Sequence, residues 1–186
     1  MIIAVLPFRA PLFRKHRLSR GGEDYGLDKE TGDKLGFYRG NPEMEREKKV
    51  VVLDASVIVK WFVDEEGTES AIDIRKDYLD GRADIRSSEL MPFEVMNALR
   101  YNREFGHNDL CRCITALLKY QLKLYPLSEE LGTMTVNNAL NFGITVYDAA
   151  YVSISQLIGA VLYTADERLL SKLEGLENTA HLSAYR

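Results

Sequence analysis

The sequence predicts an α/β protein, a three-layer α/β/α sandwich with a central parallel β-sheet. Three observations lead to this prediction. From Lys49 to the C-terminus, short apolar runs alternate with segments whose apolar residues recur with a helical period. Strands that alternate with helices in this way are typical of a parallel sheet covered on both faces. The chain has 186 residues, of which 46% are hydrophobic, so we expect one domain of ordinary size plus an appendage.

The predicted strands are short runs that separate the helical segments. The first is KVVVLD, residues 49–54, whose consecutive apolar side chains indicate burial on both faces of a sheet. Further strands are predicted at ADIRSS (83–88), at LKLYPLS (122–128) and at the VLYT run that ends at Thr164. No internal repeat is visible in the chain.

The predicted helices have apolar residues at every third or fourth position. The strongest pattern places five apolar residues on one face: Leu110, Cys113, Ile114, Leu117 and Leu118. The segment that starts near Pro92 places four on one side: Val95, Ala98, Leu99 and Phe105. TVYDAAYVSISQLIGA is so apolar that this helix must be largely buried. The other predicted helices cover residues 56–65, 68–81 and 128–143, with a short one after Asp166.

Residues 1–48 differ from the rest of the chain. They hold scattered glycines and charges without a sustained period of two or 3.6, which indicates a flexible N-terminal extension before a domain that covers residues 49–186. Met44 opens MEREKKVVVLD and would be a natural start for that domain. We therefore hypothesise that the natural product starts at Met44, which mass spectrometry of the natively expressed protein would test.

Charge and hydropathy limit the classes of function. The formal net charge is −4, and the extension is slightly basic, so the predicted domain is more acidic than the whole chain. An acidic domain is unlike proteins that coat DNA, and a nucleic-acid partner would require a local patch or metal ions. No apolar run approaches the roughly 18 residues of a membrane span, and MIIAVLPF lacks the basic flank of a secretory signal. We expect a cytoplasmic protein with no membrane partner.

Four carboxylates occupy comparable places in the predicted fold. Asp54 ends the first strand, and Asp166 follows the VLYT strand. Glu94 and Asp148 each lie in the first turn of a predicted helix. In an open parallel sheet with right-handed crossovers, all four positions lie at the carboxyl edge, where such sheets bind their ligands. The sequence therefore predicts that the four acids converge on one crevice.

Each of these acids also has a purely structural explanation. Acids in a first helical turn complement the helix dipole, which would account for Glu94 and Asp148, and Asp54 and Asp166 could cap the helices that follow them. The combination favours a site, because four crowded carboxylates repel one another unless a cation neutralises them. Oxygen ligands without Cys or His favour Mg²⁺ or Mn²⁺ over zinc. The chemistry that follows from such a site is phosphoryl transfer, or phosphodiester hydrolysis by a metal-activated water.

The four acids stand in sequence motifs that resemble a known family. VVLDASVIVKWF, PFEVMNAL, TVYDAAYVSIS and LYTADERLL are similar, in this order, to the four acidic motifs of PIN-domain ribonucleases, particularly the VapC-like toxins of toxin–antitoxin pairs. The resemblance runs from about Lys49 to the C-terminus. It implies an α/β/α sandwich, Mg²⁺ or Mn²⁺ bound by the acidic cluster, and endonucleolytic cleavage of RNA. It also implies a homodimer that a cognate antitoxin neutralises.

Site roles follow from the resemblance motif by motif. Asp54, Glu94 and Asp148 would be the main metal-binding acids, and Asp166 would complete the site. Three further residues lie close to these acids in sequence and could orient them or a bound water: Ser56, Asn97 and Thr164. For the two hydroxyl residues, simple helix capping explains the sequence equally well. A position at the polar boundary of its helix explains Asn97 nearly as well as a role at the site does.

Two other functions stay open from the sequence. A metal-dependent phosphohydrolase could use Asp54 as a covalent nucleophile, but the haloacid-dehalogenase type of site has a second Asp two residues later, where this chain has Ser56. A non-catalytic PIN-like interaction module is the other alternative. The presence of all four acids argues against it. The RNA target and its cut site are not legible in the sequence.

Overall fold

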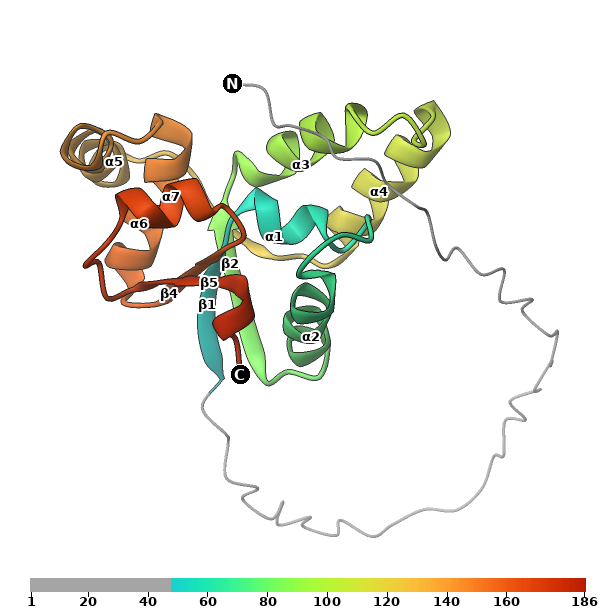
Figure 1. Cartoon of the computed structure of the whole chain (residues 1–186), viewed down its shortest axis with the longest axis horizontal. Coiled ribbons are helices and arrows are strands. Elements are labelled where there is room, and N and C mark those ends of the chain that lie inside the picture. The colour runs from blue at the N-terminus through green and yellow to red at the C-terminus, as the bar shows by residue number, and fades with distance from the viewer. Residues whose placement is uncertain (1–47) are drawn as a thin grey trace, which may run out of the picture. The chain divides into compact units, whose positions relative to one another are not determined.

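A computed structural model describes residues 48–186. Its centre is a five-stranded sheet in which every pair of neighbouring strands is parallel, in the order β3-β2-β1-β4-β5 (Figure 1). The strands are β1 (Lys49–Leu53), β2 (Ala83–Ser88), β3 (Lys123–Tyr125), β4 (Val161–Thr164) and β5 (Thr179–His181). The all-parallel sheet confirms the fold class that the sequence predicted.

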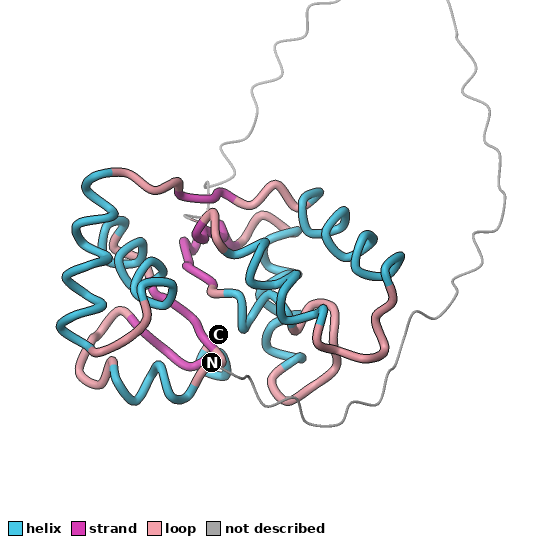
Figure 2. The backbone as a smooth tube through the Cα atoms, turned by 90° about the horizontal axis from the view of Figure 1, so that it is seen from above, coloured by secondary structure: helices cyan, strands magenta, loops and turns pink. Residues whose placement is uncertain are grey.

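Helices cover both faces of the sheet. The first group is α1 (Ala55–Val59), α2 (Thr68–Leu79), α3 (Met91–Arg100) and α4 (His107–Lys119), on one side. The second group is α5 (Glu129–Phe142), α6 (Val146–Ile158) and α7 (Glu167–Lys172), on the other side (Figure 1). A short 3₁₀ turn, Leu182–Ala184, follows β5. Figure 2 shows the strands between the two groups of helices, so the molecule has the three layers expected.

The core lies where β1 and α6 meet. Val51, Val52 and Leu53 are fully buried because β1 is the central strand and has a helical layer on each face. Residues 149–155 of α6 are all buried, since this helix packs on β1, β2 and β4 and against α5. A helix enclosed on both sides must be apolar around most of its circumference, which explains its sequence.

The topology decides where a ligand can bind. The chain leaves β1 toward β2 and β3 on one side, and it returns to β4 and β5 on the other, so the strand order reverses between β1 and β4. Ligands of open α/β sheets bind beyond the carboxyl ends of the strands at such a reversal. Asp54 follows β1 directly, and Asp166 lies two residues after β4. The two strand-end acids therefore flank the expected crevice.

Several expectations about individual elements were wrong. The helix after β1 ends at Val59, and the backbone continues in tight i to i−3 turns through Phe62. Helix α3 ends at Arg100, so Phe105 packs on the core from the following loop. Leu118 is 60% exposed, whereas the four other apolar residues of the predicted face of α4 pack on the core, Cys113 and Leu117 as buried residues and Leu110 and Ile114 as partly buried ones. β5 was not predicted, since three half-buried residues give no recognisable period.

The expected N-terminal extension and the hypothesis about Met44 concern residues that lie, apart from Lys48, outside the described part of the chain. Both stay predictions. Among residues 48–186, no helix is both long and apolar enough to span a lipid bilayer.

Candidate active site

Asp54 is buried at the carboxyl end of β1 and caps α1. Its Oδ1 accepts hydrogen bonds from the backbone N–H of Val57 at 3.2 Å and from the hydroxyl of Ser56 at 2.6 Å. The residue is only 6% exposed, since it follows the central strand directly. Asp54 is thus a helix cap, as the structural explanation required. Capping does not account for its burial, which makes its charge expensive.

The ionised form of Asp54 is destabilised by its surroundings. Burial is the main cause and raises the pKa of the Asp54 carboxyl to about 6, against 3.8 in the absence of the fold. Hydrogen bonds from Ser56, Thr164 and Val57 oppose this rise, and the nearby charge of Asp148 adds to it. A cation beside Asp54 would remove this penalty, as expected of a metal-binding carboxylate.

Ser56 and Thr164 join the ends of β1 and β4. The Ser56 hydroxyl accepts a hydrogen bond from the backbone N–H of Ala165 at 2.9 Å and lies 3.4 Å from the Thr164 hydroxyl. Thr164 is fully buried, and its Oγ1 accepts a hydrogen bond from the backbone N–H of Asp166 at 3.0 Å. The contacts of Ser56 with Ala165 and Thr164 connect residues more than 100 positions apart. They hold Asp54 against the loop that carries Asp166.

We expect Ser56→Ala to lower the free energy of unfolding. The change removes the hydroxyl that donates to Asp54 and accepts from Ala165, and unpaired polar groups of this kind cost about 1–3 kcal/mol. Chemical denaturation measures the loss. Ser171→Ala is the matched control, because the exposed Ser171 hydroxyl bonds only to a carbonyl of its own helix, α7. Equal stability of the two variants would contradict a linking role for Ser56.

Asp166 is held as the N-cap of α7. Its Oδ1 accepts hydrogen bonds from the backbone N–H groups of Arg168 at 2.8 Å and Leu169 at 3.1 Å. The residue is half-buried, whereas Asp54 is buried. This arrangement is the simple cap that the sequence also allowed. Helix capping accounts for the observed hydrogen bonds of Asp166, whereas it does not account for the burial of Asp54.

Glu94 is bound by a residue that the sequence analysis missed. The hydroxyl of Tyr151, on α6, donates a hydrogen bond to Glu94 Oε2, on α3. Burial raises the pKa of the Glu94 carboxyl, the Tyr151 hydrogen bond lowers it, and the charges of Asp54 and Asp148 raise it further. Tyr151 itself is buried, and burial together with the Glu94 charge raises its pKa, so its hydroxyl stays protonated and donates.

One sequence signal could have indicated Tyr151. It follows Asp148 by three residues in α6, so the two lie on neighbouring parts of one helix surface. A tyrosine in an otherwise apolar, buried helix needs a partner for its hydroxyl. The identity of that partner could not be read from the sequence, because Glu94 lies 57 positions away.

Asp148 lies in the first turn of α6 and is fixed by Thr145. The Thr145 hydroxyl donates to Asp148 Oδ2 at 2.7 Å, and its oxygen accepts from the Asp148 backbone N–H at 3.1 Å. A pocket of about 540 Å³ opens beside these groups. It is lined by Glu94, Thr145, Val146, Tyr147 and Asp148. Two of the four predicted acids therefore face the same pocket.

The structure brings three of the predicted acids near one another but leaves Asn97 apart from them. The negative charge of Asp148 contributes to the raised pKa of both Asp54 and Glu94, and the charge of Asp54 contributes to that of Glu94. Asn97 is exposed on α3, and no hydrogen bond joins it to Glu94 within residues 48–186. Over the same residues, no three Asp, Glu, His or Cys side chains lie close enough to form a ready metal-binding group.

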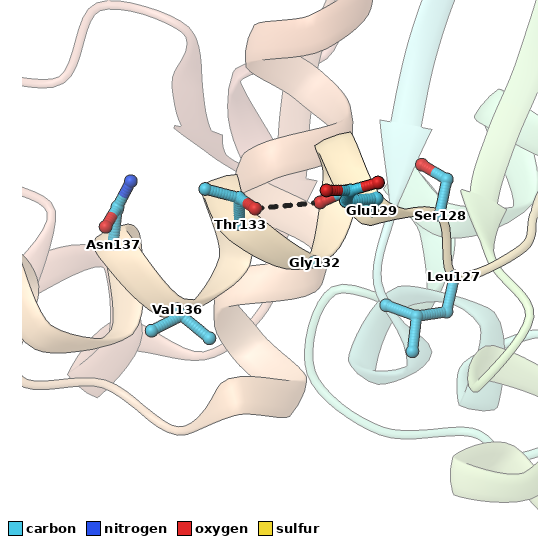
Figure 3. A pocket seen from close by; sticks show the side chains of 7 residues that line it. All are labelled: Leu127, Ser128, Glu129, Gly132, Thr133, Val136 and Asn137. Carbon is cyan, nitrogen blue, oxygen red and sulfur yellow. Dashed lines mark hydrogen bonds between the residues drawn. The ribbon is translucent and has the colours of Figure 1, made fainter.

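A second depression lies on α5, away from these carboxylates. Figure 3 shows Leu127, Gly132 and Val136 along it, with Glu129 and Thr133 joined by the hydrogen bond from the Thr133 hydroxyl to the Glu129 carbonyl. None of the predicted site residues lines it. Most of the residues that line this depression are exposed, and its surface is more apolar than polar.

The sequence profile of the PIN domain matches residues 51–176 of this chain. The chain belongs to the PIN-domain family. The match includes all four acids that the sequence analysis selected. The family resemblance inferred from the four motifs is therefore confirmed, and the fold of the central sheet agrees with it.

Several known proteins are similar to this chain over most of their own length. Ribonuclease VapC3 of Pyrobaculum aerophilum is 30% identical over 131 residues, which are 68% of this chain and 96% of that protein. A toxin–antitoxin complex from Klebsiella pneumoniae superposes with a TM-score of 0.54 at 14% identity, over 71% of this chain and 97% of its counterpart. VapC20 of Mycobacterium tuberculosis, a toxin that cleaves the sarcin–ricin loop, superposes with a TM-score of 0.52 at 13% identity, over 65% and 93%.

Proposed function

We propose that this PIN domain is a metal-dependent endoribonuclease and the toxin of a toxin–antitoxin pair. The observation that carries the proposal is the set Asp54, Glu94 and Asp148 at the carboxyl edge of the sheet, in which Asp54 is buried and the other two are half-buried beside one pocket. The relative with 30% identity is named a ribonuclease, and the similar solved structures include toxins of toxin–antitoxin systems. The substrate is RNA, whose phosphodiester bonds are hydrolysed.

The chemistry of the donor set suits a hard divalent cation, whose binding would draw the carboxylates closer together than they lie in this structure. Its members are carboxylates with hydroxyl groups beside them, and burial together with neighbouring negative charge raises the pKa of both Asp54 and Glu94. Asp54, Glu94 and Asp148 would hold Mg²⁺ or Mn²⁺, with Asp166 completing the set. The bound ion would neutralise the scissile phosphate and lower the pKa of the attacking water.

The chain's other residues orient these carboxylates. Ser56 fixes one oxygen of Asp54, Thr145 fixes one oxygen of Asp148, and Tyr151 fixes one oxygen of Glu94. Each carboxylate keeps its second oxygen for other partners. A carboxylate held in this way loses less conformational entropy when it binds a ligand, which is the general role of groups that support metal ligands.

The experiment that tests the function is incubation of the purified chain, free of antitoxin, with total cellular RNA in Mg²⁺, in Mn²⁺ and in EDTA. Discrete fragments that require metal are expected, and mapping their ends gives the cut sites. A folded protein that produces no fragments with either metal would overturn the nuclease proposal in favour of a non-catalytic PIN-like module.

We expect Tyr151→Phe to reduce metal affinity or cleavage rate by about 10- to 100-fold, the usual effect of removing a group that supports a metal ligand. The variant loses only the hydroxyl that donates to Glu94 and keeps the buried ring. Cleavage rates measured against Mn²⁺ concentration report the change. Tyr120→Phe is a suitable control, because it removes a hydroxyl from a ring that packs on Trp61, away from the acids. Wild-type metal dependence in Tyr151→Phe would contradict the assigned role.

The proposed partners are a cognate antitoxin and a second copy of the chain. The surface formed by Leu127 and the exposed side of α5 best fits a homodimer, because three large apolar side chains are exposed there: Leu127, before the helix, and Val136 and Leu140 on it. Contiguous exposed apolar residues of this kind mark protein–protein contacts. Light scattering of the purified chain tests the dimer, and a monomeric mass at all concentrations would contradict it.

A further inference from the structure

The pocket beside Glu94 and Asp148 has apolar and aromatic lining residues that metal binding does not require. Its lining combines two carboxylates with Thr145, Val146 and Tyr147, and none of these residues is basic. A phosphate inside this pocket would be repelled unless it contacted the metal directly. The pocket therefore suits a neutral group that lies next to the scissile phosphate.

Tyr147 gives this pocket an exposed aromatic wall. It lies one residue before Asp148 in the first turn of α6, and 59% of its surface is accessible to solvent. Val146 beside it is 56% exposed. Phe93, one residue before Glu94 on α3, is 68% exposed, so each pocket carboxylate follows an exposed aromatic side chain. Large side chains that remain exposed beside a polar site indicate a binding surface.

We propose that Tyr147 is the stacking platform for an unpaired nucleobase adjacent to the RNA bond that is cut. The inference rests on the proposed ribonuclease function and names how that site holds its substrate. Every nucleobase has a π-face that stacks on an aromatic ring, and unstacked bases of single strands are recognised in this way. A volume of about 540 Å³ is in the range of pockets that take small ligands.

Duplex RNA does not present a base in this manner. A paired base offers only its edge to the surface of the helix, so a base that stacks on Tyr147 must be unpaired or flipped out. The geometry thus selects cut sites in loops and single strands, in addition to whatever sequence preference the rest of the surface imposes.

The test measures RNA binding by the full chain with the substitution Asp54→Asn, which prevents cleavage during the measurement. The probes are fluorescein-labelled 12-mers of uridine and of adenosine, and an abasic 12-mer that has the same phosphates without bases, all in Mg²⁺. Added to this background, Tyr147→Ala should raise the Kd of the base-bearing probes about 5- to 150-fold, the usual effect of losing one stacked base. The Kd of the abasic probe should not change.

Two further variants make the result specific. Tyr147→Phe keeps a ring and should bind like the parent. Tyr101→Ala is the matched control, since Tyr101 is 58% exposed but lies at the opposite end of α3 from Glu94, and it should change neither Kd. An unchanged Kd for the base-bearing probes in Tyr147→Ala, or an equal loss for the abasic probe, would overturn the inference.

The outcomes also separate this inference from the proposed function. If the wild type cleaves RNA and Tyr147→Ala cleaves and binds equally well, only the stacking role is lost. If Tyr147→Ala binds RNA normally but binds its antitoxin more weakly, the exposed ring is a peptide-binding surface and the inference fails. If the wild type cuts no RNA while base binding depends on Tyr147, the nuclease function fails and the base platform stands.

Discussion

Replacing Asp54 by asparagine is expected to reduce RNA cleavage more than about 100-fold, beyond the effect of removing a residue that only supports a metal ligand. Asn keeps the shape of the side chain and an Oδ1 that accepts from Val57 and Ser56, so the cap of α1 is retained. What it removes is the negative charge that a cation would require. Cleavage assays with total RNA in Mn²⁺, read beside circular dichroism spectra, measure loss of activity separately from loss of fold.

The control for this prediction is Asp73→Asn. Asp73 is an exposed acid on α2 whose partner is Lys76, so the same chemical change is made far from the site. Wild-type activity is expected for this variant. Undiminished cleavage by Asp54→Asn would disprove the site assignment, whatever the result for Asp73. If both the wild type and the variant leave RNA intact, the alternative of a non-catalytic module is favoured.

The free energy of unfolding of the metal-free wild type, relative to that of Asp54→Asn, should decrease as the pH rises from about 4 to 7. Asp54 has a folded-state pKa of about 6 and an unfolded value of 3.8, so the folded state binds its proton more tightly. The stabilising contribution of this proton is fully present below pH 3.8 and is lost as the pH rises through 6. The difference corresponds to about 3 kcal/mol, from 1.36 kcal/mol for each pKa unit. Glu94, whose pKa is also raised, acts in the same direction.

Urea unfolding in EDTA at a series of pH values measures this effect. The informative quantity is the difference between the wild type and Asp54→Asn, because other groups such as Asp77, whose pKa is lowered, contribute slopes of opposite sign to both proteins. At neutral pH the metal-free variant should be the more stable protein, by up to about 3 kcal/mol. If the difference in unfolding free energy between the wild type and the variant does not change with pH, the pKa of Asp54 is not raised by burial and the prediction is wrong.

Adding Mg²⁺ or Mn²⁺ should reverse this order. A ligand that binds only the folded state stabilises it by RT ln(1 + [L]/Kd), or about 4.1 kcal/mol at a concentration of 1,000 Kd, which exceeds the deficit of about 3 kcal/mol in the metal-free wild type. The wild type should gain this stability at neutral pH and the variant should gain much less. Asp54 would then lower the stability of the metal-free protein and support activity when metal is bound. Such a trade-off between stability and activity is common in active sites.

Much of the fold and part of the site could be predicted from local sequence. Consecutive apolar residues before Asp54 indicated a central strand, and the strongly apolar segment around Tyr151 indicated a buried helix. These features depend on near neighbours, since a strand buried on both faces must be apolar at consecutive positions. The positions of the four acids at element ends followed from the same patterns, combined with the rule that parallel sheets bind ligands at their carboxyl edge.

The tertiary structure alone decided which of these residues meet. The pairing of β1 with β4 brings Ser56 to Ala165 across 109 positions, and the packing of α6 brings Tyr151 to Glu94 across 57. Burial of Asp54, the capping geometry of Asp166 and the exposure of Tyr147 likewise arise from how the layers pack. Local periodicity carries no information about these contacts, because they form between segments that the chain brings together only when the whole sheet assembles.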